Sequence, residues 1–192
     1  MSRKDQVTIV SGLPRSGTSM MMMILEAGGI PVLADGIRTA DEDNPKGYYE
    51  FERVKKIKED TAWLPDAKGK VVKMISQLLL DLPEGYQYKI LFMRRKMEEI
   101  LASQKQMLVR RGTFKEDGTP DADMGRMLSL HVDQVLKKIN GMSNAELIEF
   151  DYNAILTDAG AHIPKINSFL GGNLDTTAMA AVVDQSLYRQ RK

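Results

Sequence analysis

Short apolar runs alternate along this chain with longer segments in which apolar residues recur at helical spacing. The apolar runs predict strands over residues 6–11, 70–75, 86–93 and 146–150, with a short extended piece over 30–33. The other patterns predict helices over residues 16–27, 50–61, 98–110, 122–138 and 161–170, a helical turn over 77–80 and a last helical segment over 177–191. Strands separated by helices favour parallel pairing, so we expect an α/β fold in three layers, with a central parallel β-sheet flanked by helices.

The first predicted strand leads into a glycine-bounded loop, Gly12-Leu-Pro-Arg-Ser-Gly-Thr-Ser19, and a helix follows it. Strand, glycine loop and helix form the layout of a phosphate-binding loop (P-loop), which aims backbone N–H groups and a helix N-terminus at an anion. In nucleotide hydrolases a Lys follows the second glycine of this loop. Here Thr18 stands at that position and the cation is Arg15, inside the loop. The sequence therefore predicts a P-loop fold in which the cation that contacts phosphate is an arginine inside the loop and not a lysine after its second glycine.

The residue types in the loop suit a phosphate group. Gly12 and Gly17 allow the backbone to approach an anion closely. The Arg15 guanidinium can direct two N–H groups at phosphate oxygens, and Thr18 and Ser19 supply hydroxyl donors at the helix start. The alternative is a tight strand-to-helix turn with an exposed Arg15. The agreement between strand, glycines and helix favours phosphate binding.

A second basic position follows the strand predicted over residues 86–93. Arg95 stands just beyond that strand, and Ser103 lies eight residues further on in the next predicted helix. Eight helical steps return a side chain to nearly the same face, so both residues can face one phosphate. Arg94 and Lys96 would add local positive charge. The alternative is a basic helix start followed by an ordinary surface serine.

The string Pro14-Arg15-Ser16-Gly17-Thr18-Ser19 resembles the 5′-phosphosulfate loop of the sulfotransferase superfamily. Arg95 and Ser103 resemble that family's 3′-phosphate pair, and Asn44-Pro-Lys-Gly-Tyr-Tyr-Glu50 resembles an element of many bacterial members. The resemblance covers roughly residues 7–172. It implies 3′-phosphoadenosine 5′-phosphosulfate (PAPS) as co-substrate, adenosine 3′,5′-bisphosphate as product, and no required metal.

The resemblance also implies a base that takes the acceptor's proton, which family members supply from His, Glu or Asp. Counted from the glycine loop, Asp35 lies beside the base position of the tyrosyl-protein branch and is the first candidate. Glu50 and Glu52 are the second. A solvated carboxylate in a loop or at a helix cap is the alternative for each of them. In the family, a lysine near the position of Lys73, which lies in a predicted strand, can reach the donor or the acceptor. The alternative is a lysine that ends the strand in solvent.

Length and composition bound these expectations. The 192 residues, 43% hydrophobic and 28% charged, are ordinary for a single globular domain over residues 1–192. A formal net charge of +1 gives no general attraction to nucleic acid, so anion binding must be local. The absence of cysteine excludes disulfides and thiolate metal sites and suits a cytoplasmic location. No apolar run approaches the roughly 20 residues of a membrane span.

We therefore expect a PAPS-dependent sulfotransferase that moves a sulfuryl group to an acceptor hydroxyl or amine of unknown class. A non-catalytic or regulatory nucleotide-binding protein on the same fold is the second hypothesis. A P-loop small-molecule kinase is the third, and the missing loop lysine weighs against it. The chain is short for the family, so its acceptor pocket is shallow, adapted to a large acceptor, or completed by a second subunit in a homo-oligomer.

Overall fold

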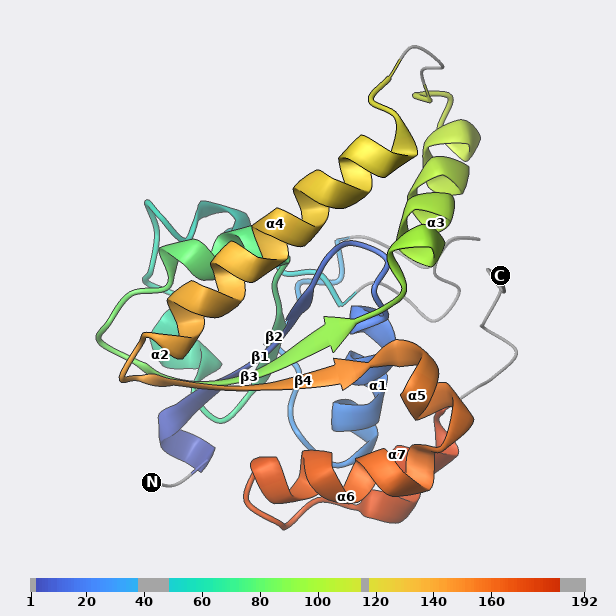
Figure 1. Cartoon of the computed structure of the whole chain (residues 1–192). Helices are drawn as coiled ribbons and strands as arrows, with labels where there is room; N and C mark the ends of the chain where they lie inside the picture. The colour runs from blue at the N-terminus through green and yellow to red at the C-terminus, as the bar shows by residue number, and fades with distance from the viewer. Residues whose placement is uncertain (1–2, 38–48, 115–117, 184–192) are drawn as a thin grey trace.

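The computed structural model describes residues 3–37, 49–114 and 118–183, and it contains one parallel β-sheet (Figure 1). Four strands line up in the order β2-β1-β3-β4. Their bounds are Gln6–Gly12 for β1, Val71–Lys73 for β2, Gln87–Arg94 for β3 and Ala145–Asp151 for β4. All three strand pairings are parallel, which confirms the sheet expected from the sequence.

Helices cover both faces of this sheet and make three layers (Figure 1). One face packs against α1, α5, α6 and α7, and its buried side chains include Met21, Ile24, Ile155 and Met179. The other face packs against η2, α2, η3 and α4, with Trp63 and Val135 among its buried residues. The bounds are Thr18–Ala27 (α1), Leu64–Ala67 (α2), Met97–Arg110 (α3), Asp121–Asn140 (α4), Tyr152–Thr157 (α5), Ala159–Phe169 (α6) and Thr176–Ala181 (α7), with 3-10 helices Arg3–Asp5 (η1), Glu52–Lys56 (η2) and Ser76–Asp81 (η3).

The strand order reverses between β1 and β3, which is where an open parallel sheet is expected to form its ligand crevice. From β1 the chain moves first to β2 on one side and then crosses to β3 on the other. In open parallel sheets, ligands bind beyond the carboxyl ends of the strands where the order reverses in this way. Gly12, the last residue of β1, pairs in register with Met93 near the end of β3. The segments that follow these two strands are therefore neighbours at the crevice.

The helix predicted over residues 50–61 is wrong. The structure forms only the 3-10 helix η2 there, followed by turns. Val54 and Ile57 are the buried residues of this segment, three positions apart, which is the period of a 3-10 helix. Arg53 also donates two hydrogen bonds from its Nε and Nη2 to Asp60, at 3.0 and 2.8 Å to Oδ2, which holds the segment in a turn.

Other elements also differ from the sequence expectation, and the four-residue helix α2 was not predicted. Helix α5 was not predicted, because its six residues are too few to show a helical period. It begins where the Asp151 carboxylate accepts a hydrogen bond from the Ala154 N–H at 2.8 Å. The helix expected over 177–191 corresponds to α7, and its part beyond residue 183 lies outside the described residues.

Candidate functional site

The loop between β1 and α1 is built around a tight turn. The Leu13 carbonyl accepts a hydrogen bond from the Ser16 N–H at 3.1 Å, so residues 13–16 close a four-residue turn. Pro14 occupies its second position and Arg15, with φ of 77°, its third. Proline followed by a positive φ is the pattern of a type II turn, whose third position favours glycine. An arginine kept in this backbone conformation points to a role for its side chain, since such strain gathers at ligand sites.

The N-terminus of α1 is open toward this turn. Gly17 precedes the helix with φ of 97°, and among the described residues no side chain caps the helix start. The first turn of α1, which begins with Thr18 and Ser19, carries no acidic residue. The Ser16 hydroxyl is buried and has no hydrogen-bond partner in the described part of the chain. Uncapped N–H groups and an unsatisfied buried hydroxyl fit an anion such as phosphate.

Gly17 lies directly against the ring of Tyr152, at the start of α5. A Cβ atom at Gly17 would come within 2.3 Å of the Tyr152 Cδ2, which is far inside van der Waals contact. Glycine is therefore required at this position both by the backbone φ and by the space available. The contact ties the loop after β1 to the element after β4.

Gly17→Ala is expected to lower the free energy of unfolding by about 2–5 kcal/mol. The left-handed backbone costs a side chain about 1–2 kcal/mol, and overpacking against the Tyr152 ring adds roughly 1–3 kcal/mol. Gly29→Ala is a matched control, because Gly29 has φ of 90° but a Cβ there meets no described atom within 4 Å. Denaturant titration of both variants measures the difference, and equal losses would show that the tyrosine contact contributes nothing.

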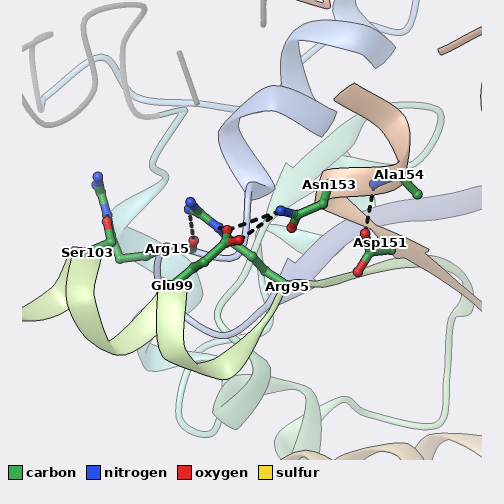
Figure 2. A network of polar contacts seen from close by, with 7 residues as sticks. All are labelled: Arg15, Arg95, Glu99, Ser103, Asp151, Asn153 and Ala154. Carbon is green, nitrogen blue, oxygen red and sulfur yellow. Dashed lines mark hydrogen bonds and ion pairs between the residues drawn. The ribbon is translucent and has the colours of Figure 1, made fainter. Parts of the chain in front are cut away.

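Helix α3 lies against the loop and contacts its turn from one side (Figure 2). Arg15 Nε donates a hydrogen bond to Ser103 Oγ at 2.8 Å. Arg95 Nη1 donates to the Arg15 carbonyl at 3.1 Å, and Gln104 Nε2 donates to the Pro14 carbonyl at 3.1 Å. Arg95 and Ser103, singled out from the sequence by their spacing, thus both contact Arg15. The basic and hydroxyl groups expected to bind two phosphates lie in one connected cluster.

Glu99 joins this cluster although the sequence reasoning did not identify it. Its carboxylate is fully buried and accepts a hydrogen bond from Arg95 Nε at 2.8 Å. Asn153 Nδ2 donates to both oxygens of the same carboxylate, at 3.0 and 3.2 Å (Figure 2). Glu99 therefore connects the end of β3 to helix α5. The four-residue spacing from Arg95 to Glu99 was the one signal in the sequence, and it is shared by many exposed helical ion pairs.

Tyr152 is a second residue that the sequence reasoning missed. Its ring lies under the Arg95 guanidinium, whose central carbon is 4.6 Å from the ring centroid. Burial raises the pKa of the Tyr152 hydroxyl, Arg95 and Arg15 oppose the rise, and Glu99 adds to it. A raised pKa keeps the hydroxyl protonated at neutral pH. The ring thus separates the loop glycine from Arg95 and orients that cation.

The candidate bases lie on the β2 side of the loop. Residues 31–33 run parallel to β2, with Val32 bridged to Val71, so Asp35 lies toward the carboxyl edge of the sheet. Its two carboxylate oxygens accept hydrogen bonds from the N–H groups of Ile37 at 3.1 Å and Glu52 at 2.6 Å. The Asp35 N–H donates to the Glu50 carbonyl at 3.1 Å. The structure therefore brings the first and second candidates together through their backbones.

The remaining candidates have these positions. Lys73 is the last residue of β2, is half-buried and pairs in register with Val10 of the neighbouring strand. The Glu52 side chain forms an exposed ion pair with Lys55 at 2.6 Å. Residues 44–48 of the element ending at Glu50 lie outside the described residues. Among the described residues, no three His, Asp or Glu side chains gather as a metal site, and no helix is long and apolar enough to cross a membrane.

No protein-family model and no curated protein sequence matches this chain. Several solved structures do, and each aligns with the whole chain at low sequence identity. The sulfotransferase domain of the olefin synthase of Synechococcus PCC 7002 matches with a TM-score of 0.55 at 10% identity over 85% of that domain. The mouse sulfotransferase SULT7A1, solved with PAP, gives 0.52 at 15% over 68% of its chain. The sulfotransferase domain from the curacin biosynthetic pathway gives 0.50 at 13% over 93%. The chain therefore has the three-layer α/β fold of sulfotransferase domains, with a P-loop after its first strand.

Proposed function

We propose that this protein is a PAPS-dependent sulfotransferase with its donor site at the carboxyl ends of β1 and β3. The observation that carries the proposal is the contact between the two phosphate-binding elements: Arg15, in its left-handed turn, is hydrogen-bonded to Ser103 and, through its carbonyl, to Arg95. The fold of sulfotransferase domains supports the same reading. We take residues 1–192 as one domain, cytoplasmic in location.

In this proposal the loop holds the 5′-phosphosulfate of the donor. Ser16, Gly17, Thr18 and Ser19 supply backbone and hydroxyl donors at the start of α1, and Arg15 supplies the cation. Pro14, which has no N–H to donate, sets the turn that carries them. Arg95 and Ser103 hold the 3′-phosphate on the β3 side. The mouse sulfotransferase with this fold was solved with PAP, which is adenosine 3′,5′-bisphosphate, and this supports a nucleotide bisphosphate as the ligand class. No metal is needed, since Arg15 neutralises the charge that develops on the leaving phosphate.

The proposed reaction is a direct transfer. An oxygen or nitrogen of the acceptor forms a bond to sulfur while the bond between sulfur and the 5′-phosphate oxygen breaks. The acceptor's proton passes to a base, and the products are the sulfated acceptor and adenosine 3′,5′-bisphosphate. Asp35 and Glu50 are the candidate bases, and Lys73, the last residue of β2, is the candidate for a contact with donor or acceptor.

A non-catalytic nucleotide-binding role is the second candidate function. One observation favours it: both carboxylate oxygens of Asp35, the first candidate base, already accept backbone hydrogen bonds. In this case the protein would bind the bisphosphate and transfer nothing.

Isothermal titration calorimetry with adenosine 3′,5′-bisphosphate tests donor binding. We expect it to bind about 10–100-fold more tightly than adenosine 5′-phosphate, because the 3′-phosphate adds charge-assisted hydrogen bonds of about 1.5–3 kcal/mol. Equal affinity for the two nucleotides would overturn the proposed 3′ site. A transfer assay with PAPS labelled on sulfur, against acceptors bearing hydroxyl or amine groups, then separates enzyme from binding protein.

A further inference from the structure

The corner between β4 and α5 lies beside the end of β3, at the carboxyl edge of the sheet. Asp151, the last residue of β4, pairs in register with the last residue of β3. Its carboxylate accepts a hydrogen bond from the Ala154 N–H at 2.8 Å, which caps the first turn of α5 (Figure 2). Tyr152 and Asn153 are the first two residues of that helix. The capped corner therefore holds both residues in place beside the proposed donor site.

Asn153 is connected to Arg95 through a buried carboxylate. Its Nδ2 group donates to both oxygens of Glu99, at 3.0 and 3.2 Å. Oε2 of Glu99 accepts a hydrogen bond from Arg95 Nε at 2.8 Å (Figure 2). Glu99 is fully buried, so a rotation of its carboxylate would break these bonds with no water to replace them. Asn153 thus sets the direction in which Glu99 presents its oxygen to Arg95.

The Arg95 guanidinium is held on two edges and on one face. Its Nε donates to Glu99, and its Nη1 donates to the Arg15 carbonyl at 3.1 Å. The ring of Tyr152 lies against its face, with 4.6 Å from the guanidinium carbon to the ring centroid. A long side chain that is free in solution loses rotamer freedom when it binds an anion. Here these contacts order the side chain before any ligand arrives.

We propose that Asn153 and Tyr152 are positioning residues that set the preference of the donor site for a nucleotide with a 3′-phosphate. Asn153 acts through Glu99, and Tyr152 acts through the face of Arg95. An arginine binds phosphate through N–H groups that lie in one plane, so the orientation of that plane decides how well the 3′-phosphate is held. The inference rests on the proposed function, because it concerns the same donor site.

A purely structural role is the alternative for both residues. The contacts of Asn153 and Tyr152 also tie α5 to α3 and to the loop after β1, and their loss would loosen the whole site. A loosened site would bind every adenine nucleotide less well. Adenosine 3′,5′-bisphosphate and adenosine 5′-phosphate differ only in the 3′-phosphate, so the ratio of their dissociation constants isolates positioning from stability.

Calorimetry with these two nucleotides on the full chain tests the role of Asn153. Asn153→Ala is expected to lower the preference for the bisphosphate about 2–10-fold, which corresponds to the cost of ordering one long side chain on binding. Its affinity for adenosine 5′-phosphate is expected to stay unchanged. Thr157→Ala is the matched control, because the Thr157 hydroxyl donates to the Asn153 carbonyl at 2.9 Å and its removal leaves the Nδ2 contacts in place. That control is expected to keep the wild-type preference.

A pair of substitutions tests Tyr152 independently. Tyr152→Phe keeps the ring under the guanidinium and is expected to keep the preference, whereas Tyr152→Leu removes the ring and is expected to lower it about 2–10-fold. The ring also lies against Gly17, so the ratio of the two affinities is compared and circular dichroism establishes that each variant is folded.

The outcomes separate this inference from the proposed function. If the wild-type chain prefers the bisphosphate and both Asn153→Ala and Tyr152→Leu keep that preference in full, the positioning role is overturned and the proposed function stands. Equal losses of affinity for the two nucleotides also overturn it, because they indicate a structural role. A wild-type chain that binds both nucleotides equally overturns the 3′ site of the proposed function, and this inference with it.

Discussion

Arg15→Ala is expected to weaken the binding of adenosine 3′,5′-bisphosphate by about 100-fold and to abolish measurable sulfuryl transfer. The guanidinium is the cation inside the loop and reaches Ser103 of the second phosphate element, so its removal affects both ends of the proposed donor site. Charge-assisted hydrogen bonds contribute about 1.5–3 kcal/mol each, and two of them correspond to roughly two or more orders of magnitude in affinity. Calorimetry with the bisphosphate measures the change.

Two variants separate the guanidinium from the fold of the loop. Arg15→Gly removes the same side chain but relieves the positive φ of 77°, so it is expected to be at least as stable as Arg15→Ala while losing the same affinity. Arg94→Ala is the control for charge, because exposed Arg94 lies at the end of β3 and pairs with Glu149 at 3.4 Å. If Arg94→Ala weakened binding as much as Arg15→Ala, general positive charge rather than the loop would bind the nucleotide.

The sheet and its loop could be predicted because their signals are local. The buried strand β1 contains the apolar residues Val7, Ile9 and Val10, and the glycines that bound the following loop have the positive φ that its backbone requires. Gly17 shows the limit of that reasoning. The sequence indicated that a glycine there lets the backbone approach an anion, but the ring of Tyr152, 135 positions later, also excludes any side chain. Contacts of this kind depend on the strand order, which local patterns do not contain.

The sequence singled out the cations of the candidate site and not the groups that contact them. Arg95 and Ser103 were found from a spacing of eight, and they do lie at the loop. The sequence reasoning expected Arg95 and Ser103 to be near Arg15 because all three bind one ligand. In the structure both residues are also hydrogen-bonded to Arg15 directly. Glu99 was missed because a glutamate four residues after an arginine looks like an exposed helical pair, and its burial is set by packing against α5.

The acidic candidates show a second limit of reasoning from sequence. Asp35 was chosen by the number of residues that separate it from the glycine loop. In the structure its carboxylate accepts a hydrogen bond from the Glu52 N–H at the start of η2. A side chain that caps a turn and a side chain that takes a proton have the same sequence signature. The transfer assay proposed above is therefore best run with both Asp35→Asn and Glu50→Gln, because only a base loses turnover while nucleotide affinity stays unchanged.

Glu99→Ala is expected to lower the free energy of unfolding by about 3–5 kcal/mol. The carboxylate is fully buried, the Arg95 side chain that it pairs with is only 8% exposed, and removal of one partner leaves the other charge buried and uncompensated. Asn153 also loses the acceptor for its Nδ2 group. At about 2–4 °C per kcal/mol for a chain of this size, the melting temperature is expected to fall by roughly 10 °C. Glu99→Gln keeps an acceptor oxygen and is expected to lose less.

The neighbouring residue supplies the control. Glu98 lies beside Glu99 in the first turn of α3 but is exposed, so Glu98→Ala is expected to lose only the helix-dipole contribution of about 0.3–1 kcal/mol. The double variant Arg95→Ala with Glu99→Ala leaves neither charge unpaired. Its loss is therefore expected to be smaller than the sum of the two single losses, by at least about 1 kcal/mol. Simple additivity in denaturant titrations would mean that Glu99 stabilises the fold without holding Arg95 at the loop, and the oriented 3′-phosphate site would lose its structural basis.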